Sequence, residues 1–388
     1  MDEKSSPQVP PGRGTPATPP SVPESVDPGP YRRAKWKVRL AVPIFVIVLV
    51  LVTGEGLSRL IPSREAPVLW DEHPLCFKVQ VPDARVARPL GETTFDYETD
   101  HFGFRGVSLK TAKHPPDAYR IVFLGDDGTL AEGLPEAQTF PALVEQTLEK
   151  RRGEKDPRIE VANAAGPGFF LPVVHATLLH RVLPLEPDMV VVMCAAADAR
   201  AALGHDWSED LSALTPHPEP PSFADWFCTV SGFAHLLRAK ARAWGFAPSP
   251  RARTPLDALG PEDAGADPKR ALASYRRFLG LTASACKRAR AELVFLTQPT
   301  LYKESLTPEE RKALPHGSDD ALRKAIDLFN EELRSAAPRE GARLVDLASL
   351  MARDLDRLKD DENLTPSGHA IAAQVIVEDL WKDKPARR

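Results

Sequence analysis

Two adjacent carboxylates, Asp126 and Asp127, follow the apolar residues 121–124 and stand between two glycines. An apolar run that ends in Gly-Asp-Asp-Gly is typical of a buried parallel strand that delivers polar side chains to a tight turn. In open α/β sheets, ligands bind at the carboxyl ends of the strands. The pair therefore marks a candidate site, although an ordinary polar turn at a strand end is the plainer interpretation of the same residues.

These carboxylates suggest two kinds of phosphate or metal chemistry. Asp126, Asp127 and Asp198 could supply hard oxygen ligands to Mg²⁺ from adjoining strand ends, but adjacent carboxylates in a turn more often cap a helix. Residues 127–129, Asp-Gly-Thr, are similar to the phosphatase signature of the haloacid-dehalogenase class. The nucleophilic Asp of that signature would fall at Gly125, which excludes the class. We expect no metal ion and no other cofactor.

The elements that must position these residues alternate between strand and helix from about residue 118 onward. Five strands separated by helices imply a parallel sheet covered on both faces, with right-handed crossovers. A long insertion rich in Pro and Trp interrupts the pattern at residues 204–267, with a helix near residues 233–244. The predicted strands are residues 119–124, 159–163, 189–194, 293–297 and 343–347, and the predicted helices are residues 139–151, 171–182, 268–290, 319–336 and a last helix after Pro366.

The N-terminal region predicts a membrane anchor. Residues 1–30 contain nine prolines and almost no large apolar side chains, so they are predicted to be a disordered tail. Residues 38–58 are apolar over about 20 residues, roughly the length that a membrane-spanning helix needs. Basic residues between Arg32 and Arg39 precede the span, which favours a cytosolic tail and an extracytoplasmic remainder, periplasmic if the cell is bacterial. A cleaved signal peptide and a buried core helix are the alternatives.

Composition limits the function classes. The chain has 388 residues and a formal net charge of −4, which offers no overall field for nucleic acid. Cys76, Cys194, Cys228 and Cys286 are widely spaced, without the spacing of a metal site. Cys76 and Cys228 could pair in an oxidising compartment. Residues 61–117, rich in Pro and Gly, predict a stalk with a small β extension before the domain at 118–384.

Three segments carry a resemblance to a known family. Residues 124–129 (Leu-Gly-Asp-Asp-Gly-Thr), 163–168 (Asn-Ala-Ala-Gly-Pro-Gly) and 360–369 (Asp-Asp-Glu-Asn-Leu-Thr-Pro-Ser-Gly-His) occur in the order and at the strand ends expected of the SGNH/GDSL hydrolases. The sequence resembles that family over about residues 118–382, and the anchor resembles a membrane-tethered branch of it. The resemblance implies a flavodoxin-like three-layer α/β/α domain and ester hydrolysis or acyl transfer, often on acetylated or lipid substrates.

The resemblance also assigns site residues. Asp127 takes the position of the nucleophilic Ser, and Gly168 matches the glycine whose backbone N–H lies in the oxyanion hole. Ala197 takes the position of the oxyanion-stabilising Asn. Asp360 matches the Asp that orients the catalytic base, while Asn363 takes the position of the catalytic His. A hydroxyl nucleophile needs an adjacent base, so the Ser, Asn and His replacements argue against ordinary esterase activity.

Three functions stay open at this point. The chain resembles an esterase or acyltransferase but is predicted to be a pseudo-hydrolase that binds an envelope glycan, a lipid or a protein partner. An active hydrolase could instead use Asp127 with a metal ion or another base, although Asn363 cannot titrate to activate water. A structural envelope protein would fill the crevice with side chains of the insertion. His369 is expected to be a packed or capping histidine.

Overall fold

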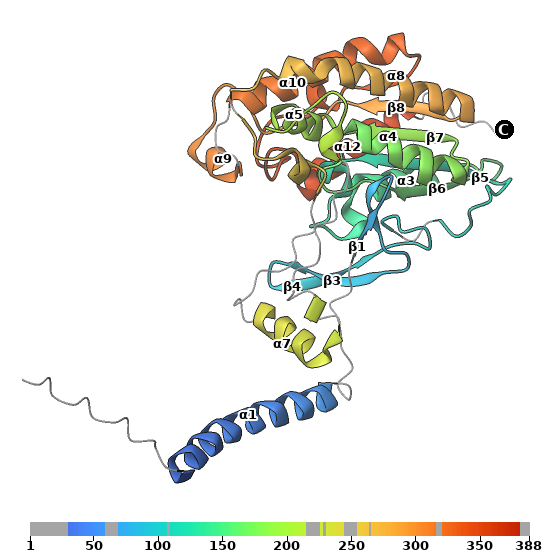
Figure 1. Cartoon of the computed structure of the whole chain (residues 1–388). Helices are drawn as coiled ribbons and strands as arrows, with labels where there is room; N and C mark the ends of the chain where they lie inside the picture. The colour runs from blue at the N-terminus through green and yellow to red at the C-terminus, as the bar shows by residue number, and fades with distance from the viewer. Residues whose placement is uncertain are drawn as a thin grey trace, which may run out of the picture. The chain divides into compact units, whose positions relative to one another are not determined.

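A computed structural model describes residues 30–58, 69–106, 109–214, 226, 227, 230–243, 254–263, 265–315 and 320–380. The chain divides into two units: Met1–Ser63 with Pro221–Ala247, and Arg64–Pro220 with Pro248–Arg388 (Figure 1). The predicted disordered tail lies outside the described residues, apart from Pro30, which begins the first helix. The insertion predicted at residues 204–267 contributes to both units.

The first unit contains the helices α1 (Pro30–Ser58) and α7 (Gly232–Ala243). Within α1, the segment Ala41–Ser58 has a mean hydropathy of 2.1, and its large apolar side chains are exposed. A core helix would bury such side chains, so that alternative is wrong. Among the described residues, one helix is therefore long and apolar enough to cross a membrane. The helix expected near residues 233–244 is confirmed as α7.

The second unit is built on the predicted five-stranded parallel sheet. Its strands lie in the spatial order β6-β5-β7-β8-β9. Counted along the chain, this order is 2-1-3-4-5, the flavodoxin-like order, with its topological switch point between the first and third strands. The expected fold class is therefore confirmed. The strands are β5 (Ala118–Gly125), β6 (Arg158–Asn163), β7 (Met189–Met193), β8 (Glu292–Leu296) and β9 (Arg343–Val345).

Helices cover both faces of this sheet. On one face, α3 (Phe140–Arg151) packs against α12 (Pro366–Leu380). On the other face, α8 (Leu272–Ala289) packs against α4 (Leu171–Thr177) and α10 (Asp320–Arg339), as Figure 1 shows for α8 and α10. The change of face after β6 follows from right-handed crossovers, because the chain reverses its direction across the sheet at the switch point. The predicted helix at residues 171–182 is α4 continued by a π-helical stretch, Leu178–Val182.

Short elements complete the second unit. Two antiparallel hairpins precede the sheet and form the small β extension: β1 (Trp70–His73) with β2 (Phe77–Gln80), and β3 (Arg85–Leu90) with β4 (Thr93–Glu98). Cys76 is a buried free thiol, and Cys228 lies outside the described residues, so their pairing stays a prediction. Further α-helices of this unit are α2 (Asp127–Leu130), α5 (Ala195–Leu203), α9 (Pro308–Ala313) and α11 (Leu347–Leu350).

Candidate functional site

The turn after β5 places Asp126 in a capping role. Asp126 is the N-cap of α2, and its Oδ1 accepts a hydrogen bond from the Gly128 amide at 3.1 Å. Its Oδ2 accepts a second, longer bond from the Ala197 amide at 3.4 Å. Burial, together with the neighbouring charge of Asp127, raises the pKa of Asp126 to about 7. Asp126 therefore ties the first strand to the helix after the third.

Asp127, in the predicted serine position, contacts the predicted oxyanion donor directly. Its Oδ2 accepts a hydrogen bond from the Gly168 amide at 2.7 Å. Gly168 has φ of +65°, a left-handed conformation that glycine adopts without strain. Burial raises the pKa of the Asp127 carboxyl, while the bond from Gly168 opposes that rise. The Asp127 carboxylate thus already accepts a hydrogen bond from the Gly168 N–H, the predicted oxyanion donor.

Asp360 and Asn363 form a closed turn. Asp360 Oδ1 accepts from the Asn363 amide at 2.8 Å, and the Asn363 side-chain Nδ2 lies 3.0 and 3.1 Å from the two carboxylate oxygens of Asp360. The same loop packs on α2, because a Cβ added at Gly128 would lie 2.6 Å from the carbonyl oxygen of Glu362. The structure therefore brings the loop of residues 360–363 beside the Asp127 turn.

Ala197 and Asp198 lie in the first turn of α5, directly after β7. Ala197 is fully buried, and its methyl side chain offers no hydrogen-bond donor to the crevice. Asp198 accepts the Leu171 amide with both oxygens, at 3.0 and 3.2 Å, and burial raises its pKa to about 8. Asp198 thus anchors the start of α4. Among the described residues, no group of three or more His, Cys, Asp or Glu side chains could hold a metal ion.

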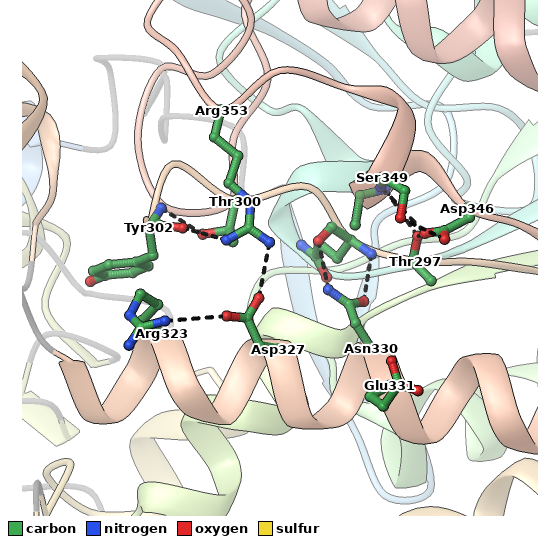
Figure 2. A network of polar contacts seen from close by, with 12 residues as sticks. Thr297, Thr300, Tyr302, Arg323, Asp327, Asn330, Glu331, Asp346, Ser349 and Arg353 are labelled. Carbon is green, nitrogen blue, oxygen red and sulfur yellow. Dashed lines mark hydrogen bonds and ion pairs between the residues drawn. The ribbon is translucent and has the colours of Figure 1, made fainter. Parts of the chain in front are cut away.

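Gln298, which the sequence analysis did not identify, joins the site from the fourth strand. Its Oε1 accepts the Ala196 amide at 2.9 Å, and its Nε2 is buried without a hydrogen-bond partner among the described residues. Asn330 on α10 holds the Gln298 backbone at both ends: its Oδ1 accepts from the Gln298 amide at 2.9 Å and its Nδ2 donates to the carbonyl at 3.0 Å. Figure 2 shows Asn330 pointing from α10 toward this loop. The position of Gln298 directly after a buried strand was the feature of the sequence that could have identified it.

Arg200 and Glu362 form the second missed group. The Arg200 Nη1 lies 3.2 Å from Glu362 Oε1, and its Nε lies 2.9 Å from Glu262 Oε1. Burial raises the pKa of Glu362 well above its usual range, and the charge of Asp127 adds to the rise. The other oxygen, Glu362 Oε2, is buried and has no hydrogen-bond partner within the described part of the chain. A proton on this oxygen would relieve the cost of burying the charge.

The end of the insertion covers part of this site. A Cβ added at Gly168 would lie 3.1 Å from the Thr254 Cβ and 3.3 Å from the Leu256 Cγ. Beside this contact a cavity of about 540 Å³ opens between α5 and the insertion. The residues that line this cavity are Arg200, Gly204, Leu256, Asp257, Gly260, Pro261 and Glu262.

His369 packs as expected of a buried histidine. Its Nδ1 accepts the Phe140 amide at 3.2 Å, and its ring stacks on the Phe140 ring with centroids 5.6 Å apart. Burial lowers its pKa to about 3, and the positive charge of Arg105 adds to the effect. His369 is therefore a neutral side chain that links α12 to the start of α3.

No protein-family model and no curated protein sequence matches the chain. The solved structures that are similar to it include three hydrolases. The acetylxylan esterase Axe2 from Geobacillus stearothermophilus has 14% identity and a TM-score of 0.42, with 70% of this chain and 97% of the esterase covered. LAE5, an alpha/beta hydrolase from the metagenome of Lake Arreo, Spain, has 17% identity and a TM-score of 0.40, with 67% and 94% covered. A G-D-S-L family lipolytic protein from Desulfitobacterium hafniense has 12% identity and a TM-score of 0.39, with 67% and 98% covered. The chain is similar to hydrolases of the SGNH/GDSL type, and its sheet has the flavodoxin-like order 2-1-3-4-5.

Proposed function

We propose that this protein is a membrane-anchored pseudo-hydrolase, which uses an SGNH/GDSL-like domain to bind a ligand without cleaving it. The observation that carries the proposal is the 2.7 Å hydrogen bond from the Gly168 amide to Asp127 Oδ2. An oxyanion hole works by directing free donors at the charge that develops in the transition state. Here the donor is occupied, and an ionised Asp127 would repel a developing oxyanion.

The proton-transfer side of the mechanism is missing as well. Asn363 is held by Asp360, as an orienting Asp would hold a base, but an amide takes up no proton near neutral pH. His369 cannot substitute for the base, because it is buried and its Nδ1 accepts the Phe140 amide. Neither Asn363 nor His369 can therefore activate a nucleophile or protonate a leaving group.

We place the ligand in the cavity between α5 and the insertion. Guanidinium and carboxylate groups from Arg200, Asp257 and Glu262 line it beside the apolar side chains of Leu256 and Pro261. Such a mixture of charged donors and acceptors with apolar surface suits a ligand rich in hydroxyl groups. Among envelope glycans, lipids and protein partners, we favour a glycan.

We also propose that α1 anchors the protein as a single span, with the N-terminus in the cytosol and the sheet domain outside it. The supporting features are the exposed apolar segment Ala41–Ser58 and the basic residues that precede it. An extracytoplasmic position agrees with an envelope glycan as ligand.

A hydrolase of altered mechanism is the second candidate. It is favoured by the raised pKa values of Asp126 and Asp127, since perturbed carboxyls often occur at catalytic sites. Structural burial accounts for the same shifts without catalysis. Turnover therefore decides between the two functions.

The deciding experiment uses the full chain in lipid nanodiscs with p-nitrophenyl acetate as substrate. We expect the unaltered protein and its Asp127→Ala variant to hydrolyse the ester no faster than Asp206→Ala, which alters an exposed carboxylate in the same unit. Turnover by the unaltered protein that Asp127→Ala abolishes and Asp206→Ala preserves would overturn the proposal in favour of the altered hydrolase.

Binding is tested separately with a tetramer of N-acetylglucosamine as the probe, by isothermal titration calorimetry. We expect saturable binding that Glu262→Gln weakens at least five-fold and Asp206→Asn leaves unchanged. A probe that does not bind, together with no ester turnover, would favour a structural envelope protein instead.

A further inference from the structure

The helix α7 and the residues just before it expose apolar side chains. Val230 is 55% exposed and Leu237 is 53% exposed, and Trp226 and Phe227 are also exposed. The larger segment, residues 226–256, contains five Lys or Arg residues and no Asp or Glu. An amphipathic helix with aromatic and basic residues is typical of segments that lie in a membrane interface.

Hydrogen bonds fix the start of α7 to the end of α1. The Ser231 hydroxyl donates to Glu55 Oε2 at 2.9 Å, the Gly232 amide donates to Oε1 at 3.2 Å, and the Phe233 amide donates to Oε2 at 3.2 Å. A carboxylate at this position also interacts favourably with the positive end of the helix dipole. The Phe233 ring packs on Gly54, where an added Cβ would lie 2.8 Å from it.

These contacts set the depth of α7 relative to the apolar segment. The 18 residues of Ala41–Ser58 extend for about 27 Å at 1.5 Å per residue, close to the hydrocarbon thickness of a bilayer. Glu55 and Gly54 lie in the last turns of that segment. If α1 spans the bilayer, α7 therefore starts at the boundary between acyl chains and headgroups.

We propose that α7, together with Trp226, Phe227 and Val230, lies in the membrane interface at the C-terminal end of α1. Leu237 and Val230 contact the upper acyl chains, and the basic side chains Arg238 and Lys240 lie at the phosphates of anionic lipids. The bilayer is favoured over a protein partner because α7 packs against α1, and both helices expose large apolar side chains. This inference rests on the proposed anchoring by α1.

The test measures quenching of a fluorophore by nitroxide-labelled lipids in the full-length protein. Cys228→Ser is the background, since Cys76, Cys194 and Cys286 are buried and resist labelling in the folded protein. A nitrobenzoxadiazole label is placed singly through Leu237→Cys on α7, Leu49→Cys on α1, or Leu350→Cys, a 63% exposed position in the other unit. The vesicles contain phosphatidylcholine and phosphatidylglycerol with nitroxide at the headgroup or deep in the acyl chain.

We expect the headgroup nitroxide to quench the Leu237→Cys label at least two-fold more than the Leu350→Cys label, and the deep nitroxide to quench the Leu49→Cys label. Quenching at residue 49 without quenching at residue 237 would overturn this inference and leave the anchor intact. No quenching at residue 49 would overturn the anchor and this inference together. Equal quenching at residues 237 and 350 would show non-specific contact and would also overturn the inference.

A second measurement separates lipid from a second copy of the chain. Lys240→Glu should reduce quenching at residue 237 at least two-fold in anionic vesicles and much less in pure phosphatidylcholine. Lys110→Glu, an exposed charge reversal in the other unit, should leave it unchanged. Quenching that ignores lipid charge, with label self-quenching that grows with protein density, would assign the surface to a second copy and overturn the inference.

Discussion

Buried carboxyl groups dominate the crevice at the scale of single residues. Three carboxyl groups are buried here, those of Asp126, Asp198 and Glu362. Burial raises the pKa of each. Their hydrogen bonds come mainly from backbone amides, and only Glu362 has a direct ionic partner in Arg200. Burial therefore favours the neutral form of these three carboxyl groups, and the bond with Arg200 opposes this effect at Glu362.

A pH dependence follows from Asp198, whose pKa rises from 3.8 to about 8 on folding. Between these values the folded state keeps a proton that the unfolded state has lost, so stability falls as pH rises from about 4 to about 8 and then levels. The slope is at most about 1.4 kcal/mol per pH unit for one group. We expect Asp198→Asn, which resembles the neutral acid, to flatten the fall in thermal stability between pH 5.5 and 7.5.

The measurement is thermal unfolding of the detergent-solubilised chain at three pH values in that interval. Asp206→Asn, which alters an exposed carboxylate, provides the matched control and should reproduce the slope of the unaltered protein. An unchanged slope in Asp198→Asn would mean that this carboxyl is ionised in the folded state at neutral pH.

Several residue roles could be predicted from the sequence and others could not. The segments with Asp127, Gly168 and Asp360 could be located because each follows a strand or precedes a helix with a clear pattern. The role of Gln298 could not, because it depends on Asn330, which is 32 residues away on another element. Arg200 was hidden for the same reason, since its partners Glu262 and Glu362 are distant in sequence.

At the scale of elements, the packing of α2 against the loop of residues 360–363 requires glycine. A Cβ at Gly128 would lie 2.6 Å from the Glu362 carbonyl oxygen, whereas nothing lies within 4 Å of a Cβ at Gly133. We expect Gly128→Ala to destabilise the protein by about 2 kcal/mol, in the range typical of overpacking. Gly133→Ala should change stability by less than about 1 kcal/mol. Denaturant unfolding checks both, and equal effects would contradict the close approach.

The helix α10 positions the loop after β8 through Asn330. In the Asn330→Ala variant, the buried backbone amide and carbonyl of Gln298 lose their partners. This loss should destabilise the protein by about 1–3 kcal/mol for each unsatisfied group. Glu331→Ala, one residue along, removes a 74% exposed carboxylate whose ion pair with Arg334 contributes about 0–1 kcal/mol. Chemical unfolding of the two variants measures the difference. Similar losses would mean that Asn330 does not hold the loop.

Elements were predicted well where burial is two-sided. Strands such as β7, buried along its whole length, give continuous apolar runs that the sequence displays directly. The helices α2 and α5 were not predicted, because each begins directly after a strand and is too short for a clear helical period. The hairpin strands β1 and β3 were also missed, since they consist of exposed and half-buried residues without a strong apolar pattern.

At the scale of the whole molecule, the proposed topology predicts which end of the chain a protease can reach. In spheroplasts of a bacterial host, we expect protease added outside to remove a tag placed after Arg388 and to leave a tag placed before Met1 intact. The physical reason is the basic segment before α1, which favours a cytosolic N-terminus. Detergent should expose both tags, and the opposite pattern would reverse the assigned orientation.

The insertion after α5 is one continuous piece of chain with contributions to both units. It leaves the sheet domain after Leu203, supplies α7 beside α1, and returns as the residues next to Gly168. Deletion of the whole insertion would therefore remove both α7, which is bound to Glu55, and the residues that form one wall of the cavity beside α5. A shortened protein without residues 1–58 would therefore leave α7 without its partner helix α1. Replacement of residues 221–247 by a short linker would instead retain the residues that line the cavity.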